Sequence, residues 1–360
     1  NLIAAFGSSS LRLAYALALS DLILAPATPS NTARVGGVIM PITTSLAKAF
    51  GSEPQDGPRK IGSFLMQSIY QVNTITSAMF QTSMAGNTLV AALALQSFGI
   101  GITWGDWAMA AIVPGVIALI IMPYFIYKVY PPEIKDAREA QQMIKEELKG
   151  LGKMSFQEWV MLGVFILALV LWATSQFTKI DATTVAFLGI SILLATSVLV
   201  WDDVKSEKGA WDTLVWMGTL MGFAGFLSKL GFIKWATVLV GAYIPEGSWI
   251  IAFVIAVLIN TYSHYVFASL TAHISAMFVA FSAIAISAGA PPMLTLLMIA
   301  FTSNLCMSLT HYAAGPSPVI FNTGYVPQNA WWKLGFFSSV INLIIFVGLG
   351  SIWMKVIGMW

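Results

Sequence analysis

The sequence predicts an all-α membrane protein with two re-entrant helical hairpins and two broken transmembrane helices. Three observations lead to this fold class. Of the 360 residues, 58% are hydrophobic and only 9% are charged, whereas ordinary soluble domains have about 25% charged residues. Several apolar runs approach the roughly 20 residues of helix that cross a hydrocarbon core. A short polar signature also occurs twice, each time between two apolar arms.

The apolar runs together allow roughly nine or ten membrane segments. The clearest predicted spanning helices are 107–127, 159–174, 183–201 and 336–354. A soluble fold is excluded because its surface would expose large apolar patches. The net charge of +2, with no basic cluster, gives no sign of a nucleic-acid partner. The single cysteine, Cys306, excludes an intrachain disulfide framework and a metal site built from several cysteines, and we expect no metal other than Na⁺.

The first copy of the polar signature, the first polar tip (residues 30–34), forms the turn of a predicted hairpin over 11–50. It reads Ser30-Asn31-Thr32-Ala33-Arg34. A broken helix over 61–98, interrupted at Ala85-Gly86-Asn87-Thr88, and a spanning helix over 107–127 follow. These elements make up a first repeat over 1–130.

The second copy, the second polar tip (residues 269–273), forms the turn of a predicted hairpin over 249–288. It reads Ser269-Leu270-Thr271-Ala272-His273. The next broken helix, 291–321, is interrupted at Ala314-Gly315-Pro316-Ser317, and a last spanning helix covers 336–354. These elements belong to a second repeat over 156–360.

The positive charges predict the orientation of the two repeats. The basic loop 51–60 and the linker 131–155, which we expect to be a surface helix, are both placed in the cytoplasm by the positive-inside rule. The first hairpin then enters from the cytoplasm and the second from the opposite side. A hairpin followed by a broken helix, twice and in opposite senses, is the inverted repeat of a secondary transporter, with its substrate site at the polar breaks.

The polar tips suit a small molecule with a carboxylate at each end, because helix N-termini offer free N–H groups and a positive dipole end. Neutral donors and small residues near the breaks would complete the substrate site. The candidate substrate residues are Ser30, Asn31, Thr32, Arg34, Asn87, Thr88, Ser269, Thr271, His273, Gly315, Pro316 and Ser317. Freed carbonyls at the breaks could hold Na⁺ instead, and this candidate cation site comprises Ser30, Asn31, Gly86 and Ala314. The alternative for any single Ser or Thr is a hydrogen bond to the backbone or to a neighbouring helix.

Arg34 and His273 occupy matching positions, two residues beyond each Thr of the two tips. A charged side chain inside a membrane is costly, so each is a candidate for positive charge near a substrate carboxylate or a coupling cation. The alternative is that Arg34 extends to the cytoplasmic face and that His273 is neutral and hydrogen-bonded. His311 presents a similar choice, and we interpret Arg12 and Asp21 as structural pairing or interface residues.

Four segments resemble the divalent-anion:sodium symporter (DASS) family, and most closely its 2-oxoglutarate/malate translocator and citrate/succinate antiporter branch. They are residues 29–37, 84–87, 268–273 and 308–312. The resemblance implies N-terminal scaffold helices beyond this sequence, a homodimer and an elevator-like transport domain. It also implies that Ser-Asn-Thr at each tip contacts the substrate and sodium. Leu270 departs from this pattern, because it stands where Asn is usual.

We therefore expect a carrier of di- or tricarboxylates of the malate, succinate, 2-oxoglutarate and citrate class, in a bacterial inner membrane or the equivalent organellar membrane. If Arg34 and His273 replace mobile Na⁺ by fixed charge, transport is an obligate exchange. The alternative is a sodium-coupled dicarboxylate symporter, and a weaker one is an anion channel. No enzyme motif lies in the apolar segments, so we expect no enzyme and no cofactor, apart from Na⁺ as a coupling ion.

Overall fold

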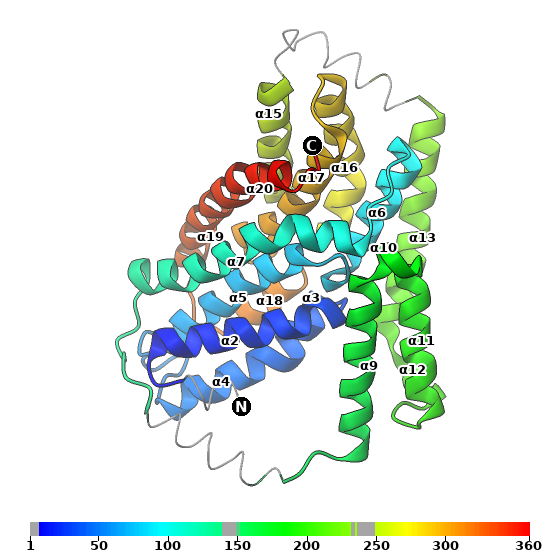
Figure 1. The fold of residues 1–360 in the computed structure, drawn as a ribbon. Coiled ribbons are helices and arrows are strands. Elements are labelled where there is room, and N and C mark those ends of the chain that lie inside the picture. The colour runs from blue at the N-terminus through cyan, green and yellow to red at the C-terminus, as the bar shows by residue number, and fades with distance from the viewer. Residues whose placement is uncertain (1–6, 139–149, 151, 232–234, 236–248) are drawn as a thin grey trace.

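The computed structural model describes residues 7–138, 150, 152–231, 235 and 249–360. The secondary structure of these residues is helical apart from one isolated bridge between Ser9 and Asp136 (Figure 1). The all-α fold class is confirmed at this level. The longer helices are α2 (Ser10–Leu24), α4 (Met40–Ala49), α5 (Gly62–Met79), α6 (Ala85–Phe98), α7 (Trp104–Val129), α9 (Phe156–Ala173), α11 (Ala182–Ala195), α13 (Lys208–Lys229), α15 (Trp249–Ser263), α16 (Leu270–Ser287), α17 (Pro292–Leu305) and α19 (Gln328–Leu343).

Short helical segments complete the described chain. They are η1 (Ala25–Ala27), α3 (Asn31–Ala33), the π-helical η2 (Arg34–Ile39), η3 (Gln81–Ser83), α10 (Ser175–Thr178), α12 (Trp201–Ser206), η4 (His264–Val266), η5 (Cys306–Leu309), α18 (Pro316–Phe321), the π-helical η6 (Ile344–Leu349) and α20 (Gly350–Val356). Helices α19, η6 and α20 run on without a break.

Within the described ranges, seven helical segments are long and apolar enough to cross a membrane. Three of them correspond to the predicted spans 107–127, 159–174 and 336–354. The predicted span 183–201 is wrong, because α11 has only 14 residues and ends at Ala195. The Thr196 hydroxyl bonds back to the Ile192 carbonyl (2.8 Å), and Ser197 has a φ of +56°, so the helix does not continue.

Helix α5 lies in the core of the molecule, although it is too polar to be counted among the seven apolar segments. All 18 of its residues are buried, against α2, α4, α7 and α17. Its buried polar side chains are Ser63, Gln67, Ser68, Gln71, Asn73, Thr74, Thr76 and Ser77. Polar groups within a membrane protein belong against other protein groups, and they mark functional sites by default. Helix α5 therefore lines the interior with polar side chains up to its C-terminal end at Met79.

Two pairs of helices, each joined at a polar tip, lie where the re-entrant hairpins are expected, and their re-entrant course stays a prediction. Helix α2 is followed by η1 and the turn at 28–30, after which α3, η2 and α4 form the second arm. Helices α15 and α16 form the other pair, joined by η4 and residues 267–269. These bounds agree with the predicted ranges 11–50 and 249–288.

Both predicted broken helices are interrupted, but the interruptions lie earlier than expected. The first break is at residues 80–84, between α5 and α6, and the second is at 310–315, between η5 and α18. Gly86 and Asn87 lie in the first turn of α6 rather than in the break. Pro316 begins α18, because the fixed φ of proline suits a first helical position and its missing N–H is not needed there.

The two basic loops lie together. The Arg59 guanidinium stacks on the Tyr130 ring at 3.6 Å from its centroid and donates to the Pro131 carbonyl (2.8 Å). The backbone N–H of Ile134 donates to the Lys60 carbonyl (2.9 Å). The prediction that loop 51–60 and the start of the linker share one face is therefore confirmed. The surface helix expected in the linker falls largely on residues 139–149 and 151, outside the described residues.

Helices α9, α11 and α13 stand at one edge of the molecule (green in Figure 1). Helix α9 packs on α11, and α13 contacts α6 and α16. The Trp104 and Trp172 rings stack at 6.3 Å and join α7 to α9. The helices that carry the polar tips and breaks thus contact this group along α6, α7 and α16.

Candidate functional site

The first polar tip is a capped helix N-terminus. The Ser30 Oγ accepts a hydrogen bond from the Ala33 N–H (3.2 Å), and the Ser30 carbonyl accepts from the Arg34 N–H (2.9 Å). The N–H groups of Asn31 and Thr32 and the Thr32 hydroxyl make no hydrogen bond within the described part of the chain. These donors and the positive end of the helix can bind an anion.

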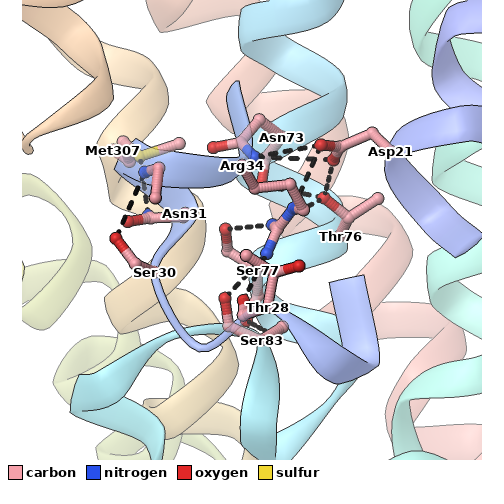
Figure 2. A network of polar contacts seen from close by, with 11 residues as sticks. Asp21, Thr28, Ser30, Asn31, Arg34, Asn73, Thr76, Ser77, Ser83 and Met307 are labelled. Carbon is pink, nitrogen blue, oxygen red and sulfur yellow. Dashed lines mark hydrogen bonds and ion pairs between the residues drawn. The ribbon is translucent and has the colours of Figure 1, made fainter. Parts of the chain in front are cut away.

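Arg34 lies in the core just behind this tip, where it makes five hydrogen bonds (Figure 2). Its Nε donates to Asp21 Oδ1 (3.0 Å), one terminal nitrogen donates to the carbonyls of Thr28 (3.1 Å) and Ser83 (2.9 Å), and the other donates to the hydroxyls of Thr76 (3.3 Å) and Ser77 (3.2 Å). A guanidinium has five N–H groups. None is left for a ligand.

Two expectations about Arg34 are therefore corrected. It does not extend to the cytoplasmic face, because it is only 1% exposed. It also does not present free positive charge to a substrate, because Asp21 neutralises it and protein groups occupy all its donors. The structural pairing expected of Asp21 is confirmed. Arg12 is exposed and donates to the Ser8 hydroxyl (2.9 Å).

The second polar tip repeats the cap. The Ser269 Oγ accepts from the Ala272 N–H (3.3 Å). The backbone N–H groups of Leu270 and Thr271 and the Thr271 hydroxyl donate to no group in the described ranges. Leu270 is buried and apolar, so this tip lacks the side-chain amide that Asn31 supplies at the first tip.

His273 is buried among neutral groups rather than aimed at a ligand as a cation. Its Nε2 lies 3.1 Å from the Ser263 Oγ, and its ring lies 4.8 Å from that of His264, centroid to centroid. The neutral alternative for His273 agrees with this geometry. His311 has a structural partner as well, because its Nδ1 accepts a hydrogen bond from the Trp332 indole (3.0 Å).

Asn87 closes the first break. Its amide nitrogen donates to the carbonyls of Ser77 (2.8 Å) and Phe80 (2.9 Å), two groups that the end of α5 leaves without helical partners. Its amide oxygen accepts from the amide of Asn304 on α17 (2.7 Å). Asn87 and Asn304 thus connect the two broken helices. Thr88 is exposed, and its hydroxyl donates to the Ala85 carbonyl in its own helix (2.7 Å).

Tyr70 bonds backbone carbonyls at the second break, as Asn87 does at the first. Its hydroxyl lies at hydrogen-bond distance from the carbonyl of Thr310 (3.1 Å) and that of Met307, and from the Ser317 Oγ (2.8 Å). The Ser317 Oγ also accepts from the Ala314 N–H (3.1 Å). Sequence reasoning missed Tyr70 and Asn304. The signal that could have revealed them is that both are polar side chains within long, deeply buried helices.

The first tip contacts the second break, and the second hairpin packs on the first turn of α6, which follows the first break. A Cβ atom on Gly315 would lie 2.1 Å from the Thr32 Oγ1, so the first tip presses on the second break. The Asn31 amide also lies 3.6 Å from the Met307 sulfur. A Cβ atom on Gly86 would lie 2.7 Å from Ile274 of α16, so the second hairpin packs beside the first break.

These contacts show which predicted site residues the structure brings together. Ser30, Asn31, Thr32, Gly315, Pro316 and Ser317 belong to one cluster, and Gly86 packs with the second hairpin. The grouping of all four candidate cation ligands stays a prediction.

A cavity of about 850 Å³ lies away from these residues, between the start of α7 and the α10–α11 segment. Charged and polar residues on its wall include Gln81, Lys179 and Asp181. None of the predicted site residues lines it.

Comparison with known proteins identifies the chain's relatives. Residues 1–360 match the family described as the sodium:sulfate symporter transmembrane region. The chain belongs to this DASS family. It is 50% identical over 356 residues to YflS of Bacillus subtilis (strain 168), whose name proposes malate transport, and covers 74% of that protein. It is 45% identical over 358 residues to dicarboxylate transporter 1, chloroplastic, of Spinacia oleracea, covering 63% of it. Both alignments include 99% of this chain.

A third relative bears on location. The chain is 40% identical over 360 residues to inner membrane protein YbhI of Escherichia coli (strain K12), covering all of this chain and 75% of that protein. With the seven apolar segments, this membership confirms an integral inner-membrane protein. The family description and the names of the first two relatives are those of transporters, in agreement with the predicted class.

Proposed function

We propose that this chain is the transport region of a secondary carrier for dicarboxylates. The observation that supports it most directly is the pair of serine-capped helix N-termini. Each offers two backbone N–H groups and one threonine hydroxyl that make no hydrogen bond to any described residue. Anions bind at such ends, and a molecule with two carboxylates can use both. The names of the bacterial and chloroplast relatives support the same substrate class.

The two hairpins are re-entrant in this proposal, and the chain is an inverted repeat of residues 1–130 and 156–360 joined by the linker 131–155. The crossed contacts support this, since Thr32 of the first tip meets Gly315, and Ile274 of the second hairpin meets Gly86. A transported substrate would then lie between the tips and the breaks, where non-helical backbone is tolerated in a membrane. A homodimer with an elevator-like motion is the corresponding proposal for assembly.

Exchange and sodium symport are each favoured by a different observation. Leu270 removes a side-chain oxygen from the second tip, which favours sodium-independent exchange of carboxylates. The Asp21–Arg34 pair favours sodium symport, because a neutralised arginine does not substitute for a coupling cation. Na⁺ would then bind at the first tip and the neighbouring break, among Ser30, Asn31 and freed carbonyls. A channel lacks such support, since the helix breaks are confined to two short segments, residues 80–84 and 310–315.

The test is uptake of labelled malate into liposomes that contain the purified protein. Saturable uptake that requires internal malate or succinate supports exchange, and uptake into empty liposomes driven by a sodium gradient supports symport. Uptake of neither kind, or flux that rises linearly with concentration, contradicts a carrier. A panel of competing carboxylates then defines the substrate.

Matched variants test the location of the substrate site. The double variant Thr32→Val and Thr271→Val removes both free hydroxyls at nearly constant volume and should abolish uptake. Thr44→Val is the control, because the Thr44 hydroxyl only bonds back to the Met40 carbonyl in its own arm (2.9 Å). Normal uptake by the double variant would place the substrate elsewhere.

A further inference from the structure

Three potential metal ligands lie together beside the second polar tip. They are His264 in η4, His273 in α16 and Cys306 at the start of η5. One ligand atom from each lies within 4.8 Å of the other two, and all three residues have no exposed surface. The cluster therefore joins both arms of the second hairpin to the segment that leads into the second break.

The hydrogen bonds of His264 fix which of its nitrogens carries the proton. Its Nε2 lies 2.8 Å from the Ala313 carbonyl, which can only accept, so Nε2 is the protonated nitrogen. The Nδ1 atom then carries a lone pair, and this buried atom has no hydrogen-bond partner among the described residues. A metal-binding histidine has this arrangement, with one ring N–H donated to a carbonyl and the other nitrogen free.

The same deduction applies to His273. The Ser263 hydroxyl donates to the Asn260 carbonyl (3.0 Å), so its oxygen is left to accept from the His273 Nε2, 3.1 Å away. The His273 Nδ1 is then unprotonated, buried and also without a hydrogen-bond partner. A buried acceptor left unpaired costs stability, and two of them beside a thiol call for a ligand.

We propose that His264, His273 and Cys306 form a zinc-binding site. Two imidazoles and a thiolate suit Zn²⁺, whereas Na⁺, Mg²⁺ and Ca²⁺ prefer oxygen ligands. Around a tetrahedral Zn²⁺ the ligand atoms lie about 3.5 Å apart. The three ligand atoms, which lie within 4.8 Å of one another, would draw together by about 1 Å on binding. On binding, the Cys306 thiol loses its proton to water, and its sulfur becomes a ligand.

A bound Zn²⁺ would hold the second hairpin against the second break. Three protein ligands leave one position for water or another small donor. At the equivalent position of the first tip, the Arg34–Asp21 ion pair provides the stabilising contact instead. The site therefore makes the rigidity of the second tip depend on a metal, independently of which substrate the protein carries.

The test uses Co²⁺ as an optical substitute for Zn²⁺ on the metal-stripped protein, purified through a tag without histidine. Cys306 is the only cysteine of the chain, so thiolate-to-cobalt absorption can arise only from this site. We expect this absorption to saturate at one Co²⁺ per chain and to disappear when Zn²⁺ is added. Zn²⁺ should also raise the midpoint of thermal unfolding, because it binds the folded state. Absence of both effects overturns the proposal.

Variants then assign the ligands. Cys306→Ser should lose the thiolate absorption, and His264→Gln and His273→Gln should each weaken cobalt binding about 10-fold or more. His311→Gln is the matched control and should bind cobalt as the wild type does, since its Nδ1 already accepts from Trp332. Unchanged binding by both His264→Gln and His273→Gln would overturn the proposed ligand set. If a variant fails to fold, as judged by circular dichroism, the wild-type titration alone decides.

Discussion

Arg34 and Asp21 form an ion pair in the interior, with 3.0 Å between Arg34 Nε and Asp21 Oδ1. The pair joins the two arms of the first hairpin, because Asp21 lies in α2 and Arg34 begins η2. Arg34 also donates to the Ser83 carbonyl in the first break (2.9 Å). The first polar tip is thereby fixed to the end of α5, and its free N–H groups are held in place before any anion arrives.

Asp21→Asn should strongly destabilise the protein. The change leaves a buried guanidinium without its counter-charge, and breaking a buried pair in this way costs about 3–5 kcal/mol. The free energy of unfolding, measured in detergent with increasing denaturant, provides the test. Asp202→Asn is the control, since Asp202 pairs with Lys205 on the surface, where such a pair contributes about 0–1 kcal/mol.

A double variant separates charge from packing. Asp21→Asn combined with Arg34→Gln removes both charges and should recover part of the stability that Asp21→Asn loses. Equal stability of the single variant and the wild type would show that Arg34 finds other compensation. It would also return Arg34 to the candidates for substrate binding.

The sequence located both hairpins because proline, glycine and small polar residues interrupt long apolar runs, and such residues mark turns in membrane helices. It could not reveal what Arg34 contacts, because Asp21, Thr76 and Ser83 come from three separate segments that only the fold brings together. The sequence also could not predict the exact ends of α5 and η5. They depend on Asn87 and Tyr70, whose side chains satisfy carbonyls in distant or preceding segments.

Gly315→Ala should disturb the contact between the first tip and the second break. The added Cβ would lie 2.1 Å from the Thr32 Oγ1 and 3.3 Å from the Thr32 Cβ, so the tip must shift. A displacement of about 1 Å at a binding site can reduce turnover about 100-fold. We therefore expect the rate of malate uptake to fall much more than the amount of folded protein.

Gly37→Ala is the matched control for this change. Gly37 lies in the second arm of the first hairpin, the hairpin that carries Thr32. A Cβ on Gly37 would meet nothing within 4 Å. Alanine favours a helix over glycine by about 1 kcal/mol, so stability should stay equal or rise, and uptake should not change. Equal uptake by Gly315→Ala and Gly37→Ala would show that the Thr32–Gly315 contact is unimportant for transport.

Tyr70→Phe should lower stability while it preserves the packing of the ring. The change removes the hydroxyl that bonds the Met307 carbonyl and lies near the Thr310 carbonyl and the Ser317 Oγ, and a buried polar group left unpaired costs about 1–3 kcal/mol. Tyr124→Phe, at an exposed site on α7, serves as the control. Thermal unfolding of both variants measures the difference, and identical midpoints would show that the second break does not need Tyr70.

Asn87 and Asn304 allow a graded test of the connection between the broken helices. Asn87→Ala removes one donor from each of the Ser77 and Phe80 carbonyls, to which Ser83 also donates, and removes one acceptor of the Asn304 amide, so it should cost about 1–3 kcal/mol of unfolding free energy and abolish uptake. Asn304→Ala removes only the bridge and should cost less, because Asn87 still binds both carbonyls. Asn322→Ala, exposed after α18, should behave as the wild type. Denaturant titration of the three variants gives the order. If Asn304→Ala proved as harmful as Asn87→Ala, the bridge between the helices, and not the closure of the first break, would be the main contribution of Asn87.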